Sequence, residues 1–206
     1  MSDPLKQQLP LTELAICVAG EWRRGRGHAY ASIYPADGSV SAELHAASAA
    51  DAVEAVERAD DACRRTDRAS RKPHERARVL YRVAEGIRAR REELAQWQRR
   101  DNGKPINETR ALVDSAAGTF QFFGAACETL DDQLTPMRGD QLTMSLHEPM
   151  GVVAAITPWN SPTATPFGGW RDSGIGREKG RLGILEYMEQ KSLYWGMNAA
   201  PLPWAA

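Results

Sequence analysis

The chain has 206 residues, of which 42% are apolar and 26% are charged, a composition typical of one globular domain or slightly more. Its 26 basic and 27 acidic residues nearly cancel, and acids are interleaved with the arginine clusters, which argues against a nucleic-acid-binding protein. No apolar run approaches the roughly 20 residues of a membrane span, and the first residues lack a signal-peptide pattern, so we expect a cytoplasmic protein without membrane contact.

The N-terminal region predicts a small β structure. Leu14–Val18 has the pattern of a short strand and is followed by a turn at Gly20–Trp22. Ala31–Tyr34 and Val40–Leu44 flank the turn-forming pair Asp37–Gly38, which favours a hairpin. We therefore expect short paired strands before the first helix.

Ser48 and Asp51 form a capping-box pattern at the start of the first expected helix. The residues that follow place small and apolar side chains at helical spacing, which predicts an amphipathic helix. This apolar stripe contains Val53, Val56, Ala59 and Cys63.

A second helical pattern begins at Pro73, a residue favoured at the first helical position, with Glu75 in the first turn. Apolar residues recur at helical spacing until Asn102–Gly103 ends the pattern; they are Val79, Leu80, Val83, Ile87, Leu94 and Trp97. A further helix is expected over residues 107–130. The same spacing predicts that it buries Leu112, Val113, Ala116, Phe120, Phe123 and Cys127.

Two strands of different kinds are expected next. Gln141–Glu148 alternates apolar and polar residues, which is typical of a half-buried strand. Val152–Ile156 is apolar on both sides, which is typical of a strand inside a parallel sheet covered by helices on each face. The second strand therefore needs a surrounding sheet.

The three cysteines, Cys17, Cys63 and Cys127, are widely spaced, with no CxxC pair and no histidines at metal-ligand spacing. We interpret them as buried or inert thiols and expect no metal site. A nucleophilic Cys63 stays open as an alternative, because the two arginines that follow it could lower its thiol pKa.

Two motifs lie almost next to each other. Glu148–Asn160 reads EPMGVVAAITPWN and Pro166–Gly180 reads PFGGWRDSGIGREKG, with only Ser161–Thr165 between them. Both resemble signatures of the NAD(P)-dependent aldehyde dehydrogenase superfamily. In that family the first motif ends the opening strand of the cofactor domain and the second lies near the C-terminus. The resemblance therefore implies an internal deletion.

The resemblance covers nearly the whole chain and implies a partial aldehyde dehydrogenase fold of the α/β class. It implies a helical N-terminal layer, β-hairpin and oligomerisation strands, and a remnant of the Rossmann-like cofactor domain. By this interpretation residues 1–160 form the N-terminal part of the cofactor-binding and oligomerisation region. Residues 161–165 are the deletion junction, and residues 166–206 are the C-terminal segment.

The first motif implies a cofactor site for NAD or NADP. In the family the backbone of this segment contacts the nicotinamide cofactor, and the asparagine amide that matches Asn160 helps to form the oxyanion hole. A neutral donor held in place stabilises developing negative charge without reorganisation. The implied cofactor-binding residues are Ile156, Thr157, Pro158, Trp159 and Asn160.

The second motif implies a substrate tunnel and a subunit contact. Phe167 matches a tunnel-lining phenylalanine, and Arg177 and Glu189 match positions that form an ion pair near the subunit interface. An ordinary surface pair is the alternative. Residues 191–195 match a strand of the oligomerisation sheet. The glycines of SGIGREKG have the spacing GxGxxxG and follow no strand, so we reject a dinucleotide fingerprint.

In function, the resemblance implies oxidation of an aldehyde to a carboxylic acid with hydride transfer to NAD(P). The segment missing between the two motifs would carry the nucleophilic cysteine, the general-base glutamate and most of the cofactor fold. We therefore expect a chain that is inactive by itself. The alternatives are an interaction and oligomerisation partner of full-length aldehyde dehydrogenase subunits, or a degenerate fragment without a selected function. A homo-oligomer is the other assembly that the resemblance implies.

Overall fold

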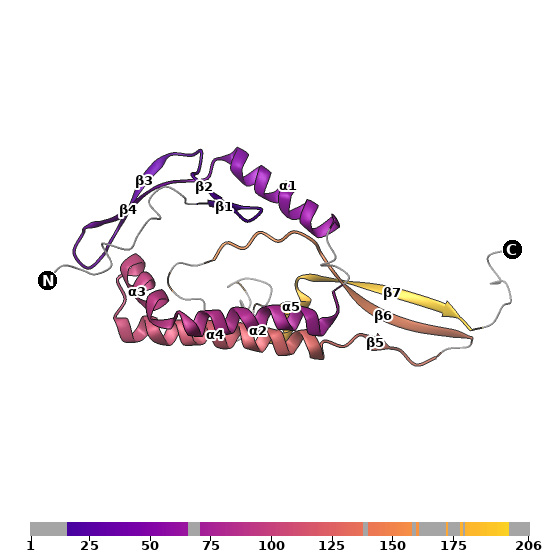
Figure 1. Cartoon of the computed structure of the whole chain (residues 1–206). Helices are drawn as coiled ribbons and strands as arrows, with labels where there is room; N and C mark the ends of the chain where they lie inside the picture. Colours follow the sequence, from indigo (N-terminus) through magenta and orange to yellow (C-terminus); the bar gives the residue numbers. More distant parts are fainter. Residues whose placement is uncertain are drawn as a thin grey trace.

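The computed structural model describes residues 16–65, 71–137, 140–157 and 180–197, together with Asn160, Asp172 and Glu178. A first layer contains four short strands and one helix, a second layer contains three helices, and a three-stranded arm projects from one end of the second layer (Figure 1). The chain therefore has the mixed α/β class that the sequence predicts. Within the described part, no helix combines the length and the apolarity that crossing a membrane requires.

A tight hairpin opens the first layer. Strands β1 (Ile16–Val18) and β2 (Glu21–Arg23) pair antiparallel, and the turn residues Ala19 and Gly20 have φ of 53° and 88°. Positive φ at both central residues matches the twist of the flanking strands. The turn lies slightly earlier than the sequence predicts, because Glu21 and Trp22 already belong to β2.

The second hairpin confirms the predicted turn at Asp37–Gly38. Strands β3 (Ala29–Ile33) and β4 (Val40–His45) pair antiparallel around it. Gly38 has a φ of 73°, and the Asp37 carboxylate accepts a hydrogen bond from the backbone N–H of Ser39 at 2.8 Å. The side chain of Asp37 thus stabilises the turn locally.

The predicted capping box starts helix α1 (Ala49–Arg65). Ser48 Oγ accepts a hydrogen bond from the Asp51 N–H at 3.2 Å, and Asp51 Oδ2 accepts one from the Ser48 N–H at 2.8 Å. Asp51 is only 2% exposed and also accepts hydrogen bonds from the backbone and side chain of Arg26. Backbone hydrogen bonds from Ser48 and then Arg26 hold the pKa of Asp51 far below its ordinary range. This carboxylate also lies 3.3 Å from the Arg23 guanidinium and so joins α1 to the first hairpin.

The second helical pattern divides into two helices, α2 (Pro73–Ala89) and α3 (Arg91–Asn102). At Arg90 the backbone turns away from helical geometry, with φ −108° and ψ 24°. Residues 88–93 read RARREE and offer no large apolar side chain that would hold the helix straight against a neighbour. The expectation of one continuous pattern to Asn102 is therefore wrong at this point.

Small residues let α2 pack closely against α4 (Ile106–Thr129). Ala77, Ala84 and Ala117 are at most 1% exposed. Gly124 of α4 lies against the ring of Tyr81 from α2. Val113 is buried as the sequence predicts, whereas Phe120 is 37% exposed, so the buried stripe of α4 is narrower than expected.

Two ion pairs fasten α3 to α4. The Arg91 guanidinium donates to both carboxylate oxygens of Asp114 at 2.6 and 2.7 Å. Arg110 donates to both oxygens of Glu92, each at 2.8 Å. Paired hydrogen bonds of this kind fix the orientation of both side chains, so they set the angle between the helices.

The two layers meet at α3. Arg100 is 7% exposed, donates through Nε to Ser41 Oγ at 3.2 Å and lies 5.9 Å from the centroid of the Tyr34 ring. Gly103 ends α3 in the left-handed conformation, with φ 75°, and packs against Pro35. The predicted helix end at Asn102–Gly103 is confirmed, and the same residues anchor the β3–β4 hairpin.

The arm is a three-stranded antiparallel sheet in the order β5-β6-β7. Strand β6 (Gln141–Pro149) lies between the short β5 (Gln133–Leu134) and β7 (Met188–Gly196), and a short helix α5 (Gly180–Leu185) precedes β7. All nine residues of β6 pair with β7. The predicted strands at 141–148 and 191–195 are confirmed, and they lie side by side (Figure 1).

Gly124→Ala should destabilise the protein by about 1–3 kcal/mol, because the new Cβ would lie 2.6 Å from Tyr81 Cε1 and force the helices apart. Gly118→Ala on the same helix is the matched control, since nothing lies within 4 Å of its Cβ position. It should stabilise by about 1 kcal/mol through helix propensity. Urea unfolding measures the change in the free energy of unfolding for both variants. A change of the same sign in the two would contradict the close packing of α2 on α4.

Hydrogen bonds from Arg110, and then from Gln96, lower the pKa of Glu92 from its ordinary 4.5 to about 2. A lowered folded-state pKa contributes stability that is present above the unfolded value and lost as the pH falls toward 2. Glu92→Gln should therefore be less stable than the parent near neutral pH, and the difference should shrink between about pH 5 and pH 2. Urea midpoints across this range test it, and a difference that does not change with pH would contradict the pairing of Glu92 with Arg110.

Candidate functional site

The segment expected to bind the cofactor follows β6 and has no regular secondary structure over residues 150–157. The predicted strand Val152–Ile156 is therefore wrong for this chain. Val152 and Val153 are 41% and 48% exposed, and Ile156 is 97% exposed. A strand that is apolar on both faces forms only between neighbouring strands and covering helices. The described residues supply neither.

Three of the five residues expected to contact the cofactor lie in the described part of the chain. Ile156, Thr157 and Asn160 are all exposed. Pro158 and Trp159 lie outside the described residues. The described part of this segment is therefore exposed to solvent and forms no cleft for a nicotinamide ring.

The tunnel and interface residues are tested only in part. Phe167 and Arg177 lie outside the described residues, so the expected Arg177–Glu189 ion pair stays a prediction. Glu189 is exposed on β7, directly opposite Glu148 on β6. Lys191, two residues further along β7, donates to Glu148 at 3.1 Å and offsets the repulsion between the two carboxylates.

The three cysteines are free thiols and none is fully buried, so they do not meet the buried part of the expectation, and their inertness stays a prediction. Cys17 is exposed on β1, whereas Cys63 and Cys127 are half-buried on α1 and α4. Arg64, the neighbour of Cys63, is engaged by Asp60 at 2.8 Å. Among the residues with a described placement, no three His, Cys, Asp or Glu side chains are arranged to hold a metal ion.

The arm carries a surface that the sequence analysis did not identify. Its β7 strand has a partner on one side only, because β7 is the last strand of the described sheet. Large apolar side chains of the arm lie in water; they are Leu134, Met137, Tyr194, Trp195 and Met197, each at least 57% exposed. The consecutive residues Leu193, Tyr194 and Trp195 are the signal that could have located these exposed side chains.

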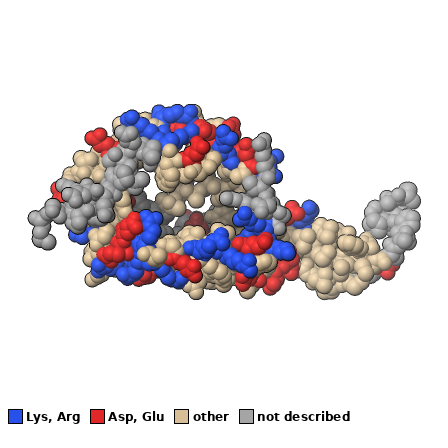
Figure 2. All heavy atoms as spheres, viewed as in Figure 1, with Lys and Arg blue, Asp and Glu red and all other residues tan. Residues whose placement is uncertain are grey.

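The surface of the arm carries less charge than the surface of the helices. Figure 2 shows acidic and basic side chains interleaved over the helices, whereas the visible face of the arm is almost uncharged. The same view shows a hollow between the α1 layer and the α2–α4 layer. The exposed Val53 and Val56 of α1, at 58% and 54%, show that the apolar stripe of this helix is not buried.

Comparisons with known proteins identify the fold. A family model described as the aldehyde dehydrogenase family matches residues 22–166. The protein DhaS of Bacillus subtilis (strain 168) is 36% identical over 129 residues, which is 62% of this chain and 26% of DhaS. Crystal structures of aldehyde dehydrogenases match the described architecture closely, so the partial aldehyde dehydrogenase fold expected from the sequence is confirmed.

A structure of P. syringae AldA, an indole-3-acetaldehyde dehydrogenase in complex with NAD+ and IAA, matches 76% of this chain with a TM-score of 0.71 and 33% identity. An NAD-dependent aldehyde dehydrogenase from Sinorhizobium meliloti matches 72% of it with a TM-score of 0.66 and 27% identity. These matches cover 32% and 30% of the two enzymes. The chain belongs to the aldehyde dehydrogenase family and spans about a third or less of the length of these relatives.

Proposed function

We propose that this chain is a member of the aldehyde dehydrogenase family that does not oxidise aldehydes by itself. The observation that supports the proposal most directly is the exposed, irregular segment of residues 150–157, where the resemblance expects the opening strand of the cofactor domain. Ile156, which would be buried in that strand, is 97% exposed. A cofactor cannot be held in a fixed position by a backbone that lacks its sheet.

The chemistry gives a second reason. Aldehyde oxidation by this family needs an activated thiol, a base that deacylates the enzyme and a bound nicotinamide. The resemblance places these groups between the two motifs, where this chain has only Ser161–Thr165. An oxyanion-hole donor at Asn160 then has no oxyanion to stabilise.

Cofactor binding is part of the same proposal. The structurally similar P. syringae AldA is in complex with NAD+. In this chain the matching segment is exposed from Met150 to Thr157, so we propose that NAD or NADP binds weakly or not at all. A ligand that binds only the folded state raises the melting temperature, and here we expect no such rise.

Purified protein should therefore form no reduced nicotinamide from aldehydes with either NAD+ or NADP+, and neither cofactor should shift its melting temperature. Absorbance of reduced nicotinamide and thermal unfolding by circular dichroism measure the two outcomes. An intact family member assayed in parallel is the positive control. Turnover that follows the protein through purification would refute the inactivity, and a cofactor-dependent rise in melting temperature would refute the loss of the binding site.

A second candidate function, association with intact aldehyde dehydrogenase subunits, is favoured by the free edge of β7. A long exposed edge strand can pair with another chain. The apolar side chains Tyr194 and Trp195, 66% and 60% exposed, would be covered by such pairing. We propose this role for the arm, with a homo-oligomer as the alternative assembly.

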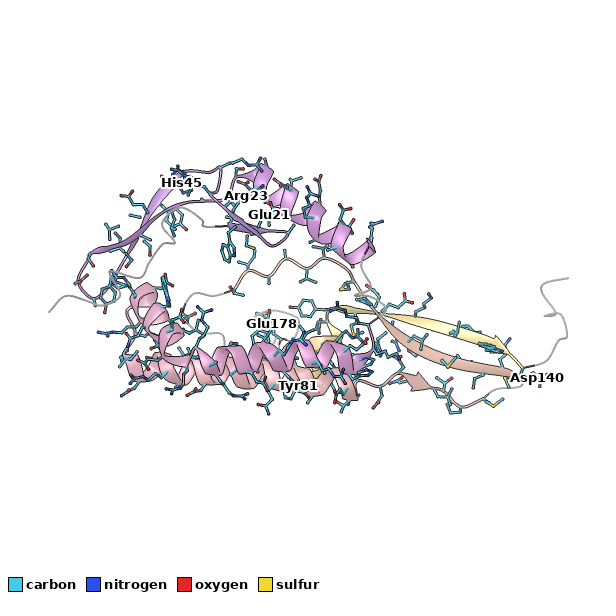
Figure 3. All side chains as sticks on the ribbon, in the orientation of Figure 1. Glu21, Arg23, His45, Tyr81, Asp140 and Glu178 are labelled. Carbon is cyan, nitrogen blue, oxygen red and sulfur yellow. The ribbon has the colours of Figure 1, made fainter. Side chains whose placement is uncertain are left out.

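The backbone register shows which amides are available. The N–H of Met197 donates to the carbonyl oxygen of Asp140, the residue just before β6, at the far tip of the arm in Figure 3. Because N–H groups alternate in direction along an antiparallel strand, Trp195 and Leu193 also face β6. The N–H groups of Ser192 and Tyr194 then point to the open edge, where a partner strand would bind them.

Ser192→Pro should abolish association with an intact subunit while the circular dichroism spectrum stays unchanged. Proline removes one outward N–H, and no hydrogen bond to β6 depends on that group. Ser192→Ala, which keeps the N–H, is the matched control and should associate like the parent. Co-purification with a tagged intact relative from the same genome measures the effect, and equal association of all three proteins would refute pairing at this edge.

A further inference from the structure

A cavity of about 690 Å³ lies where the C-terminal part of α4 meets the arm and α5. Its volume is in the range of sites that hold small organic molecules, roughly 300–1,000 Å³. Apolar side chains from three separate parts of the chain line it, namely Phe123, Leu130, Ile184, Tyr187 and Met188. The cavity therefore offers an apolar ligand a surface on several sides.

A histidine and a carboxylate provide the polar part of the lining. Asp132 Oδ1 lies 3.0 Å from the backbone nitrogen of His147 and 3.0 Å from its ring Nδ1. The carboxylate can only accept, so Nδ1 carries the hydrogen. In the neutral ring Nε2 is then a hydrogen-bond acceptor. The His147 side chain is 15% exposed and forms part of the cavity lining.

The two carboxylates of the cavity lining already have hydrogen-bonding partners. Glu148 lines the cavity but is bound by Lys191 at 3.1 Å, and Asp132 is bound by His147. Arg76 contributes a positive charge to the same lining. A cationic ligand would find both carboxylates already engaged, and Arg76 is exposed to solvent, so a charged ligand would gain little in return for the water it gives up. A neutral ligand fits these surroundings better.

We propose that this cavity binds a small neutral molecule with an apolar body and one hydroxyl donor, such as a phenol, with the hydroxyl donating to His147 Nε2. The site is independent of the aldehyde chemistry and of the β7 edge. A metal ion is a poorer occupant, because the described residues contain no group of three suitable ligands. His147 acts here as a binding residue, and Asp132 fixes its tautomer.

Cys127 lines the same cavity and reports on its occupancy. A bound molecule should shield this half-buried thiol from alkylation by iodoacetamide. Cys17 lies exposed on β1, outside the cavity, and serves as the internal reference. Mass spectrometry of the two alkylated peptides separates occupancy of the cavity from a general change in reactivity.

The test compares 4-ethylphenol with 4-ethylanisole, whose methyl ether has nearly the same shape but no hydroxyl donor. Titration followed by ligand-observed NMR should show about 3- to 10-fold tighter binding of the phenol, the factor expected for one neutral hydrogen bond. The phenol should also slow alkylation of Cys127 and leave Cys17 unchanged. Equal binding of the two probes, or no protection of Cys127, would overturn the proposal.

Variants locate the hydrogen bond. His147→Ala should remove the difference between the two probes, and Asp132→Asn should reduce it, because the amide no longer fixes the hydrogen on Nδ1. His28→Ala is the control, since His28 is exposed in the first layer and does not line the cavity. A phenol preference that survives His147→Ala would refute the assigned acceptor. The probe comparison on the parent protein decides the proposal even if a variant does not fold.

Discussion

The antiparallel ladder between β6 and β7 is the constraint on which the C-terminal part of the described structure depends. It closes a loop of 38 residues, from the end of β6 at Pro149 to the start of β7 at Met188. Closing a flexible loop of this length costs about 3 kcal/mol plus a constant. Nine paired positions, with Leu142 opposite Trp195 and Met144 opposite Leu193, offset that cost, since each cross-strand pair contributes about 0.2–1 kcal/mol. The short helix α5 and the cavity beside it exist because this ladder holds.

The helical layer is stable for a different reason. Its core is built from alanines and Gly124, which bury little area each but let α2 and α4 approach closely, while paired arginines and carboxylates orient α3. The first layer meets this unit mainly through Arg100 and Gly103 at one end of α3. A chain assembled in this way keeps its local packing without a central sheet, and the exposed stripe of α1 is the consequence.

Local sequence signals predicted the structure well wherever the stabilising partner lies nearby. The capping box of Ser48 and Asp51, the turn at Asp37–Gly38 and the end of α3 at Gly103 each depend on atoms a few residues apart. The prediction of a strand at Val152–Ile156 rests on a pattern that requires neighbouring strands and covering helices from distant parts of the chain. It is wrong because the described residues supply neither. The cavity around His147 could not be predicted, because it joins α4, β6 and α5 through tertiary packing alone.

Exposed apolar side chains and an open strand edge occur together on the arm. The layers carry interleaved charges, whereas the arm exposes Leu134, Tyr194 and Trp195 on a sheet with an open edge. Monomeric proteins rarely leave such a patch beside unpaired backbone amides, since the combination favours pairing with another chain. Residues 150–157 are also exposed, but they lack the regular edge that would bind a strand. The arm therefore combines the two features that pairing with another chain requires, since its described residues present both backbone groups at an edge and exposed apolar side chains.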